Sequence, residues 1–248
     1  LIYGLPHQTP ATMQQTLDKV LALAPDRLAV YHYAHLPHIF KPQRRIDTDA
    51  VPGSEEKLDM LQYCVQTLTR RGYVFIGMDH FAKPDDELSV ALREGLLQRN
   101  FQGYSTYADC DLVAIGVSSI GKIGSTYSQN ERNIDDYYTA IDAGHLPVMR
   151  GYQLNQDDLL RRTVIQDLMC RFALDYRAYE SVFGIPFGHY FKEELADLQQ
   201  LAELGLVRLS SHGLKVTPKG RFLIRNIAMV FDYHLRHKET KAKYSQTV

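Results

Sequence analysis

Apolar and polar residues follow one another along the chain in blocks that predict strands and helices in turn. Leu1 to Leu5 is a short apolar run that predicts a strand ending at Pro6. Thr9 and Pro10 then favour a helix start, because threonine caps free backbone amides and proline suits the first helical turn. A nearly continuous apolar run from Arg27 to Ala34 predicts a second strand, with the pattern of a parallel strand covered on both faces.

The same order repeats further along the chain. Ser54 begins a second predicted helix that Gly72 ends, and Tyr73 to Met78 predicts a third strand. Strands alternating with helices and joined by right-handed crossovers are typical of a parallel β/α barrel. We therefore expect an α/β fold whose first part is the C-terminal part of a partial parallel barrel. The long loop from His35 to Gly53 follows the second strand, where such barrels place binding groups.

Two polar residues, Asp79 and His80, follow the third strand at its C-terminal end. A histidine beside a carboxylate suits proton transfer, because histidine titrates near neutral pH. Neighbouring strand residues point to opposite faces, so we do not expect the two to pair with each other. The acidic run Asp85 to Glu87 suits the start of a helix better than a metal site with His80, and that helix is predicted to reach Asn100.

Composition shifts near Arg150, which we take as a domain boundary between residues 1–150 and 151–248. Before it, Asp111 to Ile115 predicts a strand that gives way to a small-residue loop, GVSSIG (Gly116 to Gly121), and a helix is centred on residues 134–141. After it, the pattern predicts helices and a short hairpin, as in a mostly helical domain with a winged-helix-like hairpin. The helices span about Gln156 to Ala173, Tyr176 to Phe183, Phe187 to Leu204 and Phe222 to Arg236, with the hairpin around Ser210 to Gly213.

Length and charge limit the classes of function. A chain of 248 residues with 45% apolar residues can bury a sizeable core, and its net charge of −1 favours neither nucleic acid nor an acidic membrane as partner. No apolar run approaches the roughly 20 residues of a bilayer span, and the start does not resemble a signal peptide. We therefore expect a cytoplasmic monomer with no nucleic acid or membrane partner.

Several motifs together carry a resemblance to a known family. They are GMDHFAKPDDEL (Gly77 to Leu88), RNFQGYST (Arg99 to Thr106), LIYGLP at the start, YAHLP (Tyr33 to Pro37), GVSSIGKIG (Gly116 to Gly124) and RFLIRNIAMVFDYHLR (Arg221 to Arg236). The chain resembles the oxygen-independent coproporphyrinogen III oxidases, which are radical S-adenosylmethionine (SAM) enzymes of haem biosynthesis. The match is most specific in the first two motifs.

The resemblance implies a reaction and its cofactors. In this family a 4Fe-4S cluster and two SAM molecules generate a 5′-deoxyadenosyl radical, which takes hydrogen from a propionate of coproporphyrinogen III. Loss of carbon dioxide and an electron leaves a vinyl group, and two such steps give protoporphyrinogen IX. The implied electron donor is a flavodoxin-type reductant. The alternative on the same barrel is a haem or porphyrin carrier that performs no chemistry.

The three cysteines bear on the cluster. Cys64, Cys110 and Cys170 are too scattered for a disulfide framework and lack the CxxxCxxC spacing of a radical SAM cluster loop. The chain also begins at Leu1, inside a predicted strand. We expect a fragment without the cluster-binding N-terminal part, with no metal ligands and no activity alone. A natural relative without a cluster is the alternative.

The resemblance also assigns site residues. Ile120 matches the residue that packs on the adenosyl part of the first SAM, and Ala34 matches a backbone contact to the second; the alternatives are a core isoleucine and a structural alanine. Phe101 and Gln102 offer a ring and an amide that suit the SAM or substrate pocket, or a buried aromatic and a loop amide. Asp79 and His80 are weaker candidates.

The substrate's carboxylates require arginine or lysine partners. The candidates are Arg44, Arg45, Arg99, Arg132 and Arg150, among which the sequence does not choose. A further hypothesis is that the winged-helix-like end binds DNA. From Gly151 onward the sequence holds 14 Lys and Arg against 11 Asp and Glu, a charge of only +3, which makes a cover over the barrel mouth the simpler interpretation.

Overall fold

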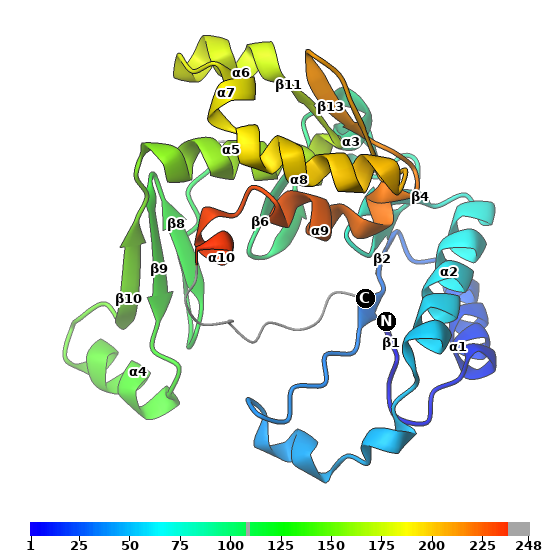
Figure 1. Cartoon of the computed structure of the whole chain (residues 1–248). Coiled ribbons are helices and arrows are strands. Elements are labelled where there is room, and N and C mark those ends of the chain that lie inside the picture. Colours follow the sequence, from blue (N-terminus) through cyan, green and yellow to red (C-terminus); the bar gives the residue numbers. More distant parts are fainter. Residues whose placement is uncertain (108–109, 238–248) are drawn as a thin grey trace.

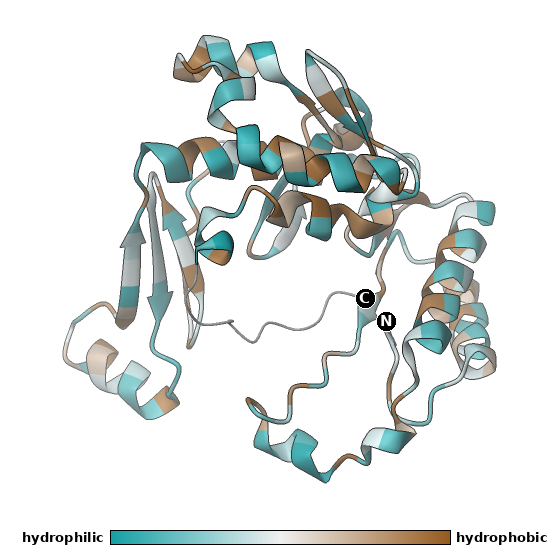
Figure 2. Cartoon of the chain, in the orientation of Figure 1, coloured by the Kyte–Doolittle hydropathy of each residue, from teal (hydrophilic) through white to brown (hydrophobic). Residues whose placement is uncertain are grey.

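The computed structural model describes residues 1–107 and 110–237. Figure 1 shows α1 and α2 beside the first strands, a sheet of β8, β9 and β10 with α4 on the opposite side, and α5, α8 and α9 between them. Hydrophobic and hydrophilic residues alternate along α2, α5 and α8, as in helices that bury one face (Figure 2). Among the described residues, no helix is long and apolar enough to cross a membrane.

The first elements largely follow the predicted order. They are β1 (Ile2–Tyr3), α1 (Pro10–Ala22), β2 (Arg27–Ala29), β3 (Tyr31–His32), two 3-10 turns (Lys41–Arg45 and Thr48–Ala50) and α2 (Ser54–Arg70). The Thr9 side chain accepts from the backbone amide of Thr12, which confirms the predicted cap of α1. Strands β1 and β3 pair in parallel, with Tyr3 opposite His32, as expected for neighbouring barrel strands.

The third strand differs from its prediction. Strand β4 (Val74–Gly77) does not lead into a loop, because the chain turns back at once as β5 (His80–Ala82). Strand β5 pairs antiparallel with both β4 and β2 and so lies between them. The expectation that Asp79 and His80 both extend from a strand end is therefore wrong: Asp79 lies in the turn, and His80 begins the return strand.

The helix after this hairpin is shorter than predicted. It is α3 (Glu87–Glu94), and it ends because Gly95 adopts the left-handed conformation, with φ of +71°. Residues up to Asn100 form β6 (Gln98–Asn100), which pairs antiparallel with β7 (Gly103–Ser105). Phe101 and Gln102 form the turn of this second hairpin.

A separate antiparallel sheet contains the predicted boundary between domains. Its strands are β8 (Ile120–Ile123), β9 (Thr126–Asn130) and β10 (Val148–Gln153), and α4 (Ile134–Asp142) connects the last two. Arg150 lies inside β10, opposite Gln129 of β9. The boundary at Arg150 stays a prediction.

The last part is mostly helical, as expected, with a small sheet. Its elements are α5 (Gln156–Arg171), β11 (Ala173–Asp175), α6 (Tyr176–Phe183), α7 (Phe187–Tyr190), α8 (Lys192–Glu203), β12 (Val207–Leu209), β13 (Gly213–Val216), a 3-10 turn (Gly220–Leu223), α9 (Ile224–Met229) and α10 (Tyr233–Arg236). The hairpin β12–β13 gains a third strand, β11, that the sequence did not indicate. The prediction of a single helix over Phe222 to Arg236 is wrong. The chain leaves α9 after Met229 and buries Phe231, and the Asp232 side chain then caps α10 by accepting from the Leu235 amide.

Two clusters of buried side chains hold the elements together. One lies between α1, α2 and the first strands and includes Met13, Met60 and Phe81. The other joins Ile76 and Leu97 of the first part to α5 and the last helices. Because the second core spans residue 150, the β4–β5 hairpin is fixed against the C-terminal helices, and this packing encloses the cavity described next.

Candidate active site

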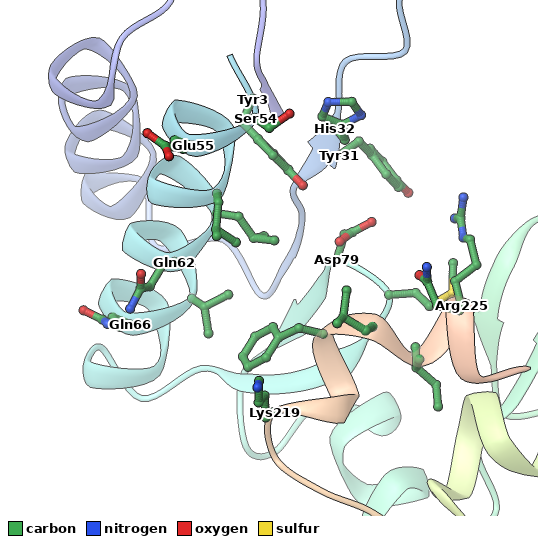
Figure 3. Close-up of a pocket in the computed structure, with 18 of the residues that line it drawn as sticks. Tyr3, Tyr31, His32, Ser54, Glu55, Gln62, Gln66, Asp79, Lys219 and Arg225 are labelled. Atoms are coloured by element: carbon green, nitrogen blue, oxygen red, sulfur yellow. The ribbon is translucent and has the colours of Figure 1, made fainter. Parts of the chain in front are cut away.

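A cavity of about 920 Å³ lies between α2, the ends of β1 and β3, the β4–β5 turn and the segment from the last 3-10 turn into α9. Figure 3 shows side chains from all of these elements pointing into it. Its volume is at the upper end of the range of small-molecule sites, so it suits a large ligand.

Most of the cavity wall is apolar. Helix α2 contributes Leu58, Leu61 and Val65 along one side, and the segment before α9 contributes Phe222 and Leu223 opposite them. Leu58 and Phe222 remain exposed although they line a concave surface. Apolar walls facing each other across open space favour a ligand with flat hydrophobic faces.

Few charged groups face this cavity. Asp79 lies at the strand ends, with Tyr31 and His32 on one side and Arg225 on the other (Figure 3). Lys219, just before the last 3-10 turn, also lines the cavity (Figure 3). A small number of polar groups in an apolar cavity fixes the orientation of a ligand.

The backbone holds Asp79 in an unusual conformation. Met78 and Asp79 are the two central residues of the turn from β4 to β5, and their φ angles are +40° and +70°. Two-residue hairpin turns of this kind require positive φ at both positions, where Asn-Gly is the favoured pair. The backbone amide of Val30 donates to the Asp79 carbonyl at 2.8 Å, which ties the turn to the neighbouring strand. The hairpin thus presents the carboxylate at a cost in backbone strain.

The carboxylate of Asp79 makes no hydrogen bond or ion pair with another residue of the described chain, so the groups around it act at longer range. Burial raises the pKa of Asp79 above its ordinary value, and the positive charges of Arg225 and Arg99 offset part of that increase. An acid left unpaired in a cavity is a candidate for ligand binding.

Both ring nitrogens of His80, the first residue of β5, make hydrogen bonds. Its Nδ1 donates to the Met78 carbonyl at 2.7 Å, so the neutral ring accepts at Nε2 from the Tyr31 hydroxyl at 3.2 Å. The ring lies edge-on between Tyr31 and Tyr104. Burial lowers the pKa of His80, which favours the neutral ring. Asp79 and His80 form no pair, and His80 does not line the cavity.

The other predicted site residues fall into two places. Ala34 lines the cavity, and its carbonyl accepts from Gln43 Nε2 at 3.0 Å. Phe101 and Gln102 are exposed in the β6–β7 turn, where the Phe101 ring contacts the ring of Tyr127 on β9. Ile120 is half-buried at the start of β8, which pairs with β9. Ile120, Phe101 and Gln102 do not line the cavity, so their roles stay predictions.

The predicted carboxylate-binding arginines are mostly at the surface. Arg44, Arg45, Arg132 and Arg150 are exposed. Arg99 is half-buried, and its guanidinium lies over the ring of Tyr104 at 5.0 Å. One buried nitrogen of this guanidinium has no hydrogen-bond partner within residues 1–107 and 110–237. None of these five lines the cavity.

Sequence reasoning missed Arg225 and Lys219, the basic residues that line the cavity. Arg225 lies within, and Lys219 just before, the stretch from Phe222 to Arg236 that the sequence predicts as one helix. They face the cavity only because that segment packs opposite α2, and no local sequence pattern predicts this contact. The RFLIRN motif (Arg221 to Asn226), which contributes to the family resemblance, was the signal that could have pointed to Arg225.

The described residues do not fit an iron–sulfur cluster. They contain no group of three or more His, Cys, Asp or Glu side chains able to hold a metal ion. Cys64 and Cys170 are buried, and burial raises the pKa of their thiols to about 11 and about 12, so they remain protonated at neutral pH. Cys110 is exposed and distant in sequence from both.

Comparison with known proteins identifies similar chains. Residues 154–223 match the HemN C-terminal domain family. An oxygen-independent coproporphyrinogen III oxidase of Pseudomonas aeruginosa is 53% identical over 235 residues, which are 95% of this chain and 51% of that protein. The protein of the same name from Thermostichus vulcanus is 48% identical over 96% of this chain and 74% of its own length.

A solved structure is also similar over most of the chain. It is described as coproporphyrinogen III oxidase (HemN) from Escherichia coli, a radical SAM enzyme, and it matches with a TM-score of 0.92 and 51% identity over 95% of this chain and 54% of its own. This match confirms the predicted α/β fold class. The chain spans about half the length of the curated relatives from Pseudomonas aeruginosa and Salmonella typhimurium that it matches.

Proposed function

The chain belongs to the oxygen-independent coproporphyrinogen III oxidase family, and we propose from this premise that it forms the substrate-binding part of such an enzyme. The proposed reaction converts two propionate side chains of coproporphyrinogen III to vinyl groups, giving protoporphyrinogen IX. One observation carries the proposal: the cavity of about 920 Å³ combines broad apolar walls with a few charged side chains at the strand ends. A tetrapyrrole with apolar faces and charged propionates has the same distribution of polarity.

The cofactors follow from the family and not from this chain's own donors. Bound SAM and a reduced 4Fe-4S cluster would supply the radical that removes hydrogen from each propionate. Because the described residues do not fit a cluster, we assign no cluster ligand to them. Ala34 and Ile120 remain the proposed SAM contacts, and Phe101 and Gln102 the proposed pocket residues.

This chain's residues would bind and orient the substrate and exclude water. The apolar walls from α2 and the segment before α9 would cover the macrocycle, which limits side reactions of a radical with solvent. Arg225 and Lys219 would neutralise propionates. The flavodoxin-type electron donor, the monomeric state, the cytoplasmic location and the absence of nucleic acid or membrane partners stay predictions.

Turnover by the full-length parent enzyme tests the proposal. The parent is reconstituted without oxygen from iron, sulfide and SAM, and given coproporphyrinogen III. We expect protoporphyrinogen IX and released methionine. SAM binding with no change in the porphyrinogen would contradict the assigned reaction, and tight haem binding without SAM cleavage would favour a carrier.

The strand β8 offers a matched pair for the SAM contact. Ile120 is half-buried and Ile123 in the same strand is exposed. We expect Ile120→Ala to raise the KM for SAM about tenfold, whereas Ile123→Ala leaves it within about twofold. Equal effects of both substitutions would refute the role of Ile120.

A further inference from the structure

We propose that the Asp79 carboxylate binds the pyrrole N–H groups at the centre of the tetrapyrrole, while Arg225 beside it binds a propionate. This inference rests on the proposed function and names the group by which the cavity distinguishes the reduced macrocycle from its oxidised form. It follows from the position of Asp79, the strain of its turn and the hydrogen-bonding chemistry of the ligand.

The position of Asp79 is unusual for a structural acid. Its carboxylate faces the cavity, is half-buried and pairs with no residue of the described chain. Withdrawing an ionised carboxylate from water without a partner opposes folding, and this shows in the raised pKa that burial causes. A ligand that donates hydrogen bonds would supply the missing partners.

The strained conformation of the turn is a second indication that the Asp79 carboxylate has a functional role. Met78 and Asp79 both have positive φ, at a place where Asn-Gly would fit without strain. Gly77, with φ of +142°, lets the turn approach Tyr104, whose hydroxyl a Cβ at Gly77 would meet at 2.6 Å. Backbone strain of this kind concentrates at functional sites.

The ligand's chemistry complements the two charges. In a porphyrinogen all four ring nitrogens carry hydrogen and point toward the ring centre, while the carboxylates lie on the rim. An ionised carboxylate only accepts hydrogen bonds, so Asp79 suits the centre and repels the rim. A guanidinium only donates, so Arg225 suits a propionate. Asp79 and Arg225 both line the cavity, so one macrocycle can place its centre at the carboxylate and a propionate at the guanidinium.

Oxidation of the ligand provides the discriminating probe. Coproporphyrin III keeps the four propionates of coproporphyrinogen III, but only two of its ring nitrogens still carry hydrogen and the ring is flat. A carboxylate at the ring centre therefore loses donors and meets acceptor nitrogens. If Asp79 contacts the centre, its removal must weaken binding of the reduced ligand more than binding of the oxidised one.

Binding is measured by anaerobic equilibrium dialysis on the full-length parent protein without added iron, with both macrocycles. We expect Asp79→Asn to weaken binding of coproporphyrinogen III by about tenfold or more and binding of coproporphyrin III by less than about twofold. Arg225→Gln should weaken binding of both about tenfold, because both carry the propionates. Asp59→Asn alters an exposed acid of α2 that does not line the cavity and should change neither by more than about twofold.

Each outcome separates the inference from the proposed function. If the unaltered protein binds neither macrocycle and does not turn over, the proposed function fails. If it binds both, and Asp79→Asn binds the porphyrinogen as tightly or weakens both ligands equally, the role of Asp79 is overturned. Asp79→Gly is a second variant that fits φ of +70° without strain, and it must behave like Asp79→Asn.

Discussion

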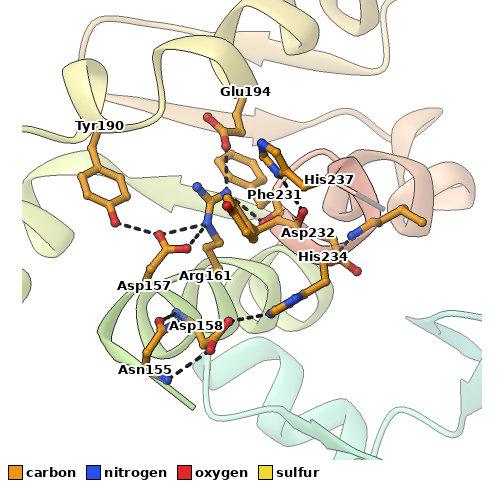
Figure 4. A network of polar contacts seen from close by, with 12 residues as sticks. Asn155, Asp157, Asp158, Arg161, Tyr190, Glu194, Phe231, Asp232, His234 and His237 are labelled. Atoms are coloured by element: carbon orange, nitrogen blue, oxygen red, sulfur yellow. Dashed lines mark hydrogen bonds and ion pairs between the residues drawn. The ribbon is translucent and has the colours of Figure 1, made fainter. Parts of the chain in front are cut away.

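The cavity and a polar network near the start of α5 both withdraw carboxylates from water, but only the network pairs these carboxylates with a cation. In the network, Arg161 contacts Asp157 at 2.8 Å and Glu194 at 2.7 Å and donates to the Phe231 carbonyl (Figure 4). In the cavity, Asp79 and Arg225 influence each other but form no ion pair within the described chain. The network completes its contacts within the fold, whereas the cavity leaves its charges available to a ligand.

Two aspartates make the difference clear. Asp158 accepts from the Asn155 amide, from Tyr152 and from His234, and although burial alone would raise its pKa, these hydrogen bonds hold it below the ordinary value. Burial raises the pKa of Asp79, which has no such donors among the described residues. Opposite shifts in two acids of one chain distinguish an acid that stabilises the fold from one that awaits a partner.

The largest expected effect is a loss of stability when the polar network loses its arginine. Arg161→Ala leaves the Glu194 carboxylate, whose side chain is 6% exposed, without its cation. We expect the free energy of unfolding to fall by about 3–5 kcal/mol, because an unpaired buried charge remains. Urea denaturation measures the change.

Arg177→Ala on α6 is the control, because Arg177 is exposed. It should change stability by less than about 0.5 kcal/mol. A loss below about 1 kcal/mol for Arg161→Ala would show that the network does not anchor the C-terminal helices. The paired charges of the network would then not be a stabilising counterpart to the unpaired charges of the cavity.

The next effect concerns the turn that presents Asp79. Gly77→Ala places a side chain at φ of +142° and against the Tyr104 hydroxyl, so we expect a loss of about 2–3 kcal/mol in thermal or urea unfolding. Gly95→Ala has positive φ but open space around it, and should cost about 1 kcal/mol. Equal losses would mean that close packing on Tyr104 does not fix the hairpin.

A smaller, pH-dependent effect tests Asp158. Because its folded pKa lies below the unfolded value of about 3.9, its stabilisation is present above that pH and is lost as pH falls through the folded pKa. Asp158→Asn should therefore cost about 1–2 kcal/mol at pH 7, and the cost should shrink as pH falls below about 4. Unfolding followed across this range checks both. A constant cost would assign the effect to shape and not to charge.

Elements with local signals were the ones that sequence predicted well. The Thr9 cap and the predicted start at Ser54 match the starts of α1 and α2, and α6 has the predicted bounds, because helix-start signals act within a few positions. The β4–β5 hairpin was missed because its turn carries Met78 and Asp79 in place of the usual glycine or asparagine. Strand β11 was missed because it pairs with β13, about 40 residues away.

The candidate site divides in the same way. Ala34 ends one predicted strand and Asp79 follows another, and both line the cavity. Arg225 was missed because the cavity forms only where the segment before α9 lies opposite α2, a contact between residues far apart in sequence. Sequence therefore locates groups at strand ends, and tertiary packing decides which side chains face them.

The smallest expected effect is a gain in stability from Asp79→Asn, and it tests the contrast between Asp79 and Asp158 directly. Asp79→Asn keeps a side chain that tolerates positive φ and removes the unpaired charge, so it should raise the free energy of unfolding by about 0.5–1 kcal/mol at pH 7. Because the folded pKa of Asp79 lies above the unfolded value, its stabilisation is complete below about pH 4 and is lost as pH rises through the folded pKa. The gain should thus be small near pH 4 and grow toward pH 7, opposite in sign to the effect of Asp158→Asn. Paired urea titrations of the two variants measure it, and a loss of stability at pH 7 would mean that the carboxylate of Asp79 already has a structural role in the fold.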